Sequence, residues 1–159
     1  MFLTRLALPL FLSLSLVAAE KYTGPVPPKA DVVYLLHADN LIETEVGKAK
    51  SDEKKDTVIA TIPGESSPVK TPLAEPIFLI KTEKLSVDKL AAFKLDVKNG
   101  QREVVVSAKK LKNMQTPIHL QVTKLSDRLY RVEVDEPLEN GEYSLSPDGS
   151  DETFSFQIY

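Results

Sequence analysis

The chain has 159 residues, of which 42% are apolar and 27% charged, and its formal net charge is −3. This length suggests one domain, or one domain and a tail, and the apolar fraction excludes a wholly disordered chain. The mildly acidic balance argues against a dedicated nucleic-acid-binding protein, which would carry a concentrated basic face. The absence of cysteine excludes disulfides, cysteine-ligated metal sites and a thiol nucleophile, and two histidines leave few catalytic designs.

The N-terminus has the three parts of a secretory signal peptide. Arg5 supplies a positive charge, residues 6–17 form a mostly apolar run, and small residues occupy the −3 and −1 positions of a cleavage site that ends at Ala19. We therefore predict residues 1–19 as a signal peptide, with cleavage between Ala19 and Glu20. The alternative, a membrane anchor, needs about 20 apolar residues, and this run is shorter and is broken by a proline and two serines.

The composition of the mature chain favours a bacterial protein. Cleavage removes 19 residues and one positive charge, which leaves 140 residues with a net charge of −4. Secreted animal domains usually carry disulfides, whereas this chain has neither a cysteine nor an Asn-X-Ser/Thr glycosylation sequon. No later apolar run is long enough to span a membrane. We expect an exported protein, periplasmic or extracellular, with no membrane span after cleavage.

The mature chain begins with a proline-rich leader and a hairpin. Residues 20–30 contain three prolines and a glycine, which predicts an extended stretch before a domain at residues 31–159. The β-rich runs at residues 32–37 and 41–46 flank Ala38-Asp39-Asn40, and this arrangement predicts a hairpin.

A charged segment follows this hairpin. Residues 47–56 hold seven charged side chains and no large apolar one, which favours a solvated loop, although the segment also fits the tip of a long hairpin. Residues 57–62 alternate and are β-branched, and Pro63-Gly64 ends this predicted strand with a turn.

Prolines and one weak helical signal mark the middle of the chain. Three prolines restrict the short runs at residues 69–71 and 77–81 to edge strands or to first positions of strands. Residues 85–92 fit a single helical turn, with Ser86 as its cap and Asp88 in its first turn.

The clearest local element is a hairpin about Asn99-Gly100. Alternating residues at 93–98 and 101–108 flank this dipeptide, which favours the type I′ turn because both of its central residues need a positive φ. Residues 108–115 form a predicted polar connection. Beyond them we expect strands at 118–123, 130–134, 143–145 and 154–158, with turns at 126–127, 140–141 and 147–149.

The regular spacing of these predicted strands and turns predicts an all-β protein. About ten short strands with turn signals every 8–12 residues are typical of an antiparallel sandwich or barrel. No stretch has a sustained apolar period of 3.6 residues, which argues against a helix-rich fold.

One motif carries a resemblance to a known fold family. Residues 137–143, PLENGEY, have the form P-L-x-x-G-x-Y and follow the β-rich residues 132–135. The motif resembles the tyrosine corner of immunoglobulin-like and fibronectin-like sandwiches, in which the tyrosine hydroxyl bonds the backbone a few residues upstream. Residues 129–147 also resemble the closing segments of small exported bacterial sandwich domains. The resemblance implies an immunoglobulin-like antiparallel β-sandwich with Greek-key connections and an extracytoplasmic module, and it implies no reaction.

Polar residues gather at two turns, and turn chemistry explains both. His37, Asp39 and Asn40 suggest part of a metal site, but such a site needs three or four converging ligands. Residues 148–152 are acidic and lack the ligand spacing of a calcium loop. We therefore assign no catalytic, cofactor-binding or metal-binding residue from the sequence.

Other polar and aromatic residues also have structural explanations. Strand parity points His119 away from the apolar face of its strand, to solvent or a second interface. Arg102 and Glu103 are predicted to form a surface cross-strand pair worth under about 1 kcal/mol. A lysine cluster favours a soluble loop or edge: Lys109, Lys110 and Lys112. Three aromatic residues are expected in the core: Tyr34, Phe78 and Phe93.

These observations lead to three hypotheses about function. The first is a non-catalytic binding or assembly module of the bacterial envelope, with a protein partner and without a cofactor or a nucleic acid. The second is a carrier of a small ligand, which predicts an apolar cavity. The third, a carboxylate-based hydrolase, predicts a concave pocket with two carboxyl groups about 5–10 Å apart.

Overall fold

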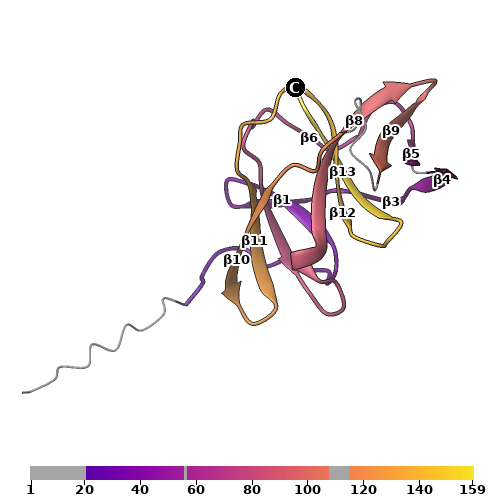
Figure 1. Ribbon diagram of the computed structural model, residues 1–159. Helices are drawn as coiled ribbons and strands as arrows, with labels where there is room; N and C mark the ends of the chain where they lie inside the picture. Colours follow the sequence, from indigo (N-terminus) through magenta and orange to yellow (C-terminus); the bar gives the residue numbers. More distant parts are fainter. Residues whose placement is uncertain (1–20, 56, 108–114) are drawn as a thin grey trace, which may run out of the picture.

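Figure 1 shows the computed structural model, which describes residues 21–55, 57–107 and 115–159. The predicted signal peptide, Asp56 and the lysine cluster lie outside the described residues. The described chain is all-β, with thirteen strands and one short 3₁₀ helix, η1 (Val87–Lys89). It forms two antiparallel sheets, which confirms the predicted all-β class.

The first sheet has five strands in the order β10-β11-β7-β1-β2. It contains two tight hairpins. His37 pairs with Asn40 across one turn, and Ser126 pairs with Leu129 across the other, so both predicted hairpins are confirmed. The strands are β1 (Val33–His37), β2 (Asn40–Glu43), β7 (Ile77–Lys81), β10 (Leu120–Ser126) and β11 (Leu129–Val134).

The second sheet has the order β3-β13-β12-β8-β9-β5-β4, and the two-residue β6 runs parallel to the end of β13. The long β8 pairs with β12 through its first six residues and with β9 through its last three. Its strands are β3 (Glu45–Lys48), β4 (Lys50–Lys54), β5 (Thr57–Pro63), β6 (Lys70–Thr71), β8 (Leu90–Lys98), β9 (Gln101–Ser107), β12 (Gly141–Pro147) and β13 (Glu152–Ile158).

The second sheet curls into a half-barrel because both of its ends belong to one stretch of chain. Only Ala49 separates β3 from β4, yet β3 pairs with β13 at one end of the strand order and β4 pairs with β5 at the other. In Figure 1, β8 extends from the body of the molecule to the end at which β9, β5 and β4 lie.

Both sheets contribute alternate residues to one buried core. The rings of Phe78 on β7 and Phe156 on β13 join the sheets, with their centroids 5.0 Å apart. Strand alternation places these side chains on one face of each strand. The core contains Val33, Leu35, Phe78, Ile80, Val87, Ala92, Val132, Tyr143, Leu145, Phe154, Phe156 and Ile158.

The charged segment at residues 47–56 is a strand rather than the favoured solvated loop. Gly47 and Lys48 lie in β3, and residues 50–54 form β4, in which every residue is exposed. The second interpretation of the segment, the tip of a long hairpin, is therefore correct for β4, because residues 50–54 pair with β5. A sheet edge rich in charge discourages pairing with other chains, so dense charge is compatible with a strand at this position.

The predicted helical turn at residues 85–92 is shorter than expected. Only Val87–Lys89 are helical, as a 3₁₀ turn, and Leu90 already begins β8. Ser86 occupies the cap position, but its side chain makes no capping hydrogen bond. Pairing of β8 with β12 from Leu90 onward outweighs the weak local helical preference.

Two predicted turn features are confirmed. Asn99 and Gly100 have φ angles of 52° and 78°, which are the two positive values that a type I′ hairpin requires. The hydroxyl of Tyr143 donates to the backbone oxygen of Glu139 at 2.8 Å, which is the upstream contact expected of a tyrosine corner.

Candidate functional site

An open cavity of about 550 Å³ lies in the hollow of the half-barrel. We call it the half-barrel cavity. Its apolar wall consists of inward-facing residues of β5, β8 and β9, among them Val58, Ala60, Phe93, Val104 and Val106. Its other wall consists of Ala49, Ser51, Thr153 and the turn at residues 146–151.

One end of the half-barrel is filled, and the other is hollow. At the filled end, Ile62, Leu95 and Val104 are buried against one another. Toward the mouth the inward positions of β5 and β8 carry the small residues Ala60 and Ala91. Because protein interiors are normally close-packed, one small side chain on each of these two strands helps to keep this space open.

Ser146 at the end of β12 and Thr153 on β13 bring hydroxyl groups to the wall of the hollow. Along both strands, residues that face the shared core alternate with serine and threonine on the opposite face. Ser144, Thr153 and Ser155 are each at most 3% exposed. Among the described residues, Oγ1 of Thr153 and Oγ of Ser155 have no hydrogen-bond partner.

Gly47 makes room for Thr153 in this wall. The two residues are cross-strand partners on β3 and β13. A Cβ at Gly47 would stand 3.3 Å from Oγ1 of Thr153, which is tighter than usual. A larger residue at position 47 would therefore press on the side chain that lines the cavity.

A buried arginine cluster lies on the same strands. The guanidinium of Arg102 on β9 is 0% exposed and donates to both carboxylate oxygens of Glu45, at 2.7 and 2.8 Å. It also donates to the backbone oxygens of Gly64 at 3.0 Å and Pro63 at 2.8 Å. Glu142 is 4% exposed, and its Oε2 lies 3.7 Å from Nη1 of Arg102. The cluster connects β9, β3, β12 and the turn after β5.

The electrostatics of this cluster depend on the arginine. Burial raises the pKa of the Glu45 carboxyl, but the hydrogen bonds and charge of Arg102 outweigh that effect and leave this pKa below its ordinary value. Oε2 of Glu142 accepts a hydrogen bond from the backbone N–H of Ser67 at 2.9 Å. Its Oε1 has no partner among the described residues, so Glu142 depends on the arginine for compensation of its charge.

The prediction of a surface pair between Arg102 and Glu103 is wrong. Neighbouring residues of a strand point to opposite faces, and here the inner face of β9 is covered by the curled sheet. Arg102 is therefore buried and bonds the half-buried Glu45, whereas Glu103 accepts a hydrogen bond from Nζ of Lys98 at 2.6 Å.

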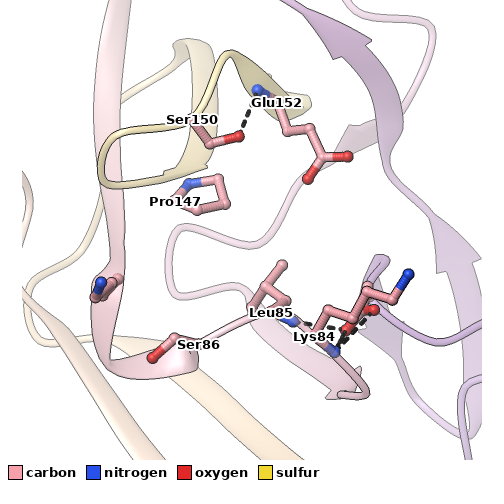
Figure 2. Close-up of a pocket in the computed structure, with 8 residues that line it drawn as sticks. Lys84, Leu85, Ser86, Pro147, Ser150 and Glu152 are labelled. Atoms are coloured by element: carbon pink, nitrogen blue, oxygen red, sulfur yellow. Dashed lines mark hydrogen bonds between the residues drawn. The ribbon is translucent and has the colours of Figure 1, made fainter.

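A second, smaller hollow of about 360 Å³ lies on the other side of the β12–β13 turn. Figure 2 shows Lys84, Leu85 and Ser86 on one side of it and Pro147, Ser150 and Glu152 on the other. Its structure is largely explained by local hydrogen bonds. Oγ of Ser150 accepts a hydrogen bond from the backbone N–H of Glu152 at 3.1 Å, and the carboxylate of Asp31 accepts hydrogen bonds from the backbone N–H groups of Lys84 and Leu85.

Asp31 organises the loop beside this second hollow. Its Oδ1 accepts hydrogen bonds from the backbone N–H groups of Glu83, Lys84 and Leu85 at 2.8, 3.0 and 2.9 Å. Partial burial raises the pKa of the Asp31 carboxyl, but these three donors outweigh that effect and lower it overall.

The polar residues that the sequence offered as candidate ligands do not come together at one site in the structure. His37 and Asp39 are exposed at the β1–β2 turn. His119 is 80% exposed, as parity predicted, and its Nδ1 contacts the carboxylate of Asp135. The acidic turn holds one weak pair, between Asp151 and Lys48 at 3.4 Å. The described residues contain no group of three or more potential metal ligands.

The three predicted core aromatics have two different positions. Tyr34 and Phe78 are buried, at 3% and 0% exposure, as expected. Phe93 is only half-buried and lines the half-barrel cavity. Strand parity correctly placed Phe93 on an inward face, but parity gave no sign that this face encloses a cavity.

No helix in the described part of the chain is long and apolar enough to cross a membrane.

Comparison with known proteins gives no relative from which a role could be transferred. No protein-family model matches the chain, and no curated protein or solved structure is significantly similar to it.

Proposed function

We propose that this protein is an exported, non-catalytic binding module of the bacterial envelope and that it holds its partner, a protein, in the half-barrel cavity. The observation that carries the proposal is the cavity itself, a mostly apolar hollow of about 550 Å³. Pockets for small molecules commonly have volumes of about 300–1,000 Å³ and mostly apolar walls, and an apolar anchor side chain of a protein partner also fits such a pocket. The apolar side chains of this wall are accessible from the open side of the cavity, which supports a binding role.

We further propose that the fold is an immunoglobulin-like sandwich with Greek-key connections. Seven strands taken in chain order, β1, β7, β8, β10, β11, β12 and β13, can be named A to G. The neighbours β10-β11-β7-β1 then correspond to D-E-B-A, and β8-β12-β13 to C-F-G, which is the distribution of strands in constant-type domains. The Tyr143 contact at the start of strand F supports the same assignment.

This assignment divides the lining of the cavity between the seven framework strands and the segments added to them. Under it, β2 to β6 are an insertion between strands A and B, and β9 is an addition after strand C. The inserted β3 to β5 and the added β9 build most of the half-barrel around strands C, F and G. Function in such folds commonly resides in additions to a shared framework, and this also supports the cavity as the binding element.

Site-specific cross-linking in the native envelope tests the binding role. A photoreactive phenylalanine analogue at Val106, in the cavity wall, should give a stoichiometric protein adduct. The same analogue at the exposed Lys124 on β10 is the matched control, because it lies on the other sheet. Equal adducts from both positions, or none from Val106, would contradict a partner in the cavity.

A small-ligand carrier is the second candidate, and the volume and apolar wall of the same cavity favour it. Native mass spectrometry of the protein purified from envelopes should then show a bound small molecule instead of a protein adduct. Export has its own test, because the signal peptide predicts a mature protein that begins at Glu20. A mature protein that begins at Met1 would contradict export by this signal.

A further inference from the structure

The mouth of the half-barrel cavity carries negative charge. Of the described residues that line the cavity, the charged ones are both acidic: Asp148 and Asp151, in the turn between β12 and β13. Lys48 approaches Asp151 only to 3.4 Å, and both side chains are more than half exposed, so water and salt weaken this pair. The protein as a whole is also acidic. The rim therefore favours a cationic group over an anionic one.

The interior of the cavity favours an apolar body. Val58, Val104, Val106 and Phe93 form one continuous wall, and no charged side chain of the described residues lies on it. The facing wall offers the Oγ1 of Thr153, which is on a residue only 3% exposed and has no partner among the described residues. An unsatisfied buried hydroxyl beside an empty hollow is an independent indication that a ligand belongs there.

From these two observations we infer that the half-barrel cavity binds a small cationic amphiphile. Its aliphatic chain or ring lies against β5, β8 and β9, and its amino or ammonium group lies at the rim beside Asp148 and Asp151. This inference rests on the second candidate function, the small-ligand carrier, and it names the chemical class of the ligand that the cavity would hold.

Three ligands of equal chain length and different charge test this selection. Octylamine, octanol and octanoate are titrated into the mature protein at pH 7 by calorimetry, below the concentrations at which they aggregate. Octylamine should bind about fivefold more tightly than octanol, which is the effect expected of a partly exposed charge pair, and octanoate should bind most weakly. Equal affinity for all three ligands would overturn the inference and leave the cavity as a binding element.

Two pairs of variants locate the binding site. Asp148→Asn should reduce the preference for octylamine over octanol, whereas Asp127→Asn, in the exposed β10–β11 turn, should not. Ala60→Phe fills the cavity and should abolish binding of all three ligands, whereas Ile59→Phe, on the opposite face of β5, should not. Circular dichroism checks that each variant is folded. Binding of octylamine that survives a folded Ala60→Phe variant would overturn the inference.

The remaining outcomes separate this inference from the proposed function. If none of the three ligands binds but the Val106 analogue still captures a protein, the inference fails and the protein-binding proposal stands. If none binds and the Val106 and Lys124 analogues behave alike, both fail.

Discussion

Replacing the buried Arg102 with methionine should lower the free energy of unfolding by about 3–5 kcal/mol. The side chain is 0% exposed and donates four hydrogen bonds, two to the carboxylate of Glu45 and two to the backbone oxygens of Pro63 and Gly64 at the end of β5. Methionine has a similar size but no donor, so these oxygens lose their partners. Glu142, which is 4% exposed, would also remain buried without a positive charge beside it.

Urea denaturation followed by circular dichroism measures this change, and the matched control is Arg128→Met. Arg128 is 60% exposed and lies 3.7 Å from Asp127, so its loss should cost under about 1 kcal/mol. A triple variant that combines Arg102→Met with Glu45→Gln and Glu142→Gln should recover part of the loss, because it removes the uncompensated buried charges.

The reasoning would be refuted if Arg102→Met cost less than about 1 kcal/mol, which is the value expected of a surface pair. The pH dependence gives a second check. The lowered pKa of Glu45 means that its ionised form adds stability above its ordinary pKa of about 4.3, and this stability is lost as the pH falls through the folded-state value. In Arg102→Met this part of the acid sensitivity should be reduced.

Three further variants test local features of the fold by the same urea assay. Tyr143→Phe removes the hydroxyl that bonds Glu139 and should cost about 0.5–1.5 kcal/mol, and an unchanged stability would show that the corner contributes nothing. Gly100→Ala should cost about 1–2 kcal/mol because the residue has a φ of 78° in open space, so the penalty is conformational rather than steric; a stabilised variant would contradict the type I′ turn. The lowered pKa of Asp31 means that its carboxylate stabilises the fold above about pH 4 and ceases to do so as the pH falls, so Asp31→Asn should flatten the stability profile between about pH 5 and 2. A profile identical to that of the wild type would show that the backbone donors around Asp31 contribute no pH dependence.

The hairpins are the part of this fold that local sequence predicts well. Asn99-Gly100 determines its turn because its two residues tolerate positive φ, and the alternation on each side decides which residues share a face. The contact of Tyr143 with Glu139 is also local, since only four residues separate the partners. Such features depend on backbone preferences within a few residues, which a single sequence displays directly.

The charged segment shows where local reasoning fails. Its composition fits a loop, and it becomes two strands because β13 and β5 supply hydrogen-bonding partners on either side. The partners on β13 lie about a hundred residues away in sequence, as Lys48 and Asp151 illustrate. A high density of charged residues indicates that a segment is exposed to solvent. Exposure alone does not distinguish a loop from an edge strand, because both are solvated.

The candidate site depends on tertiary structure for the same reason. The sequence predicted that residues 101–108 form a strand of the Asn99-Gly100 hairpin, and alternation along that strand places Arg102, Val104 and Val106 on one face. Only the curling of the second sheet decided that this face is enclosed, with Arg102 buried against Glu45 at the filled end and a cavity at the other. This face is enclosed because strands that are distant in sequence pair with one another, and no local pattern of residues specifies that pairing.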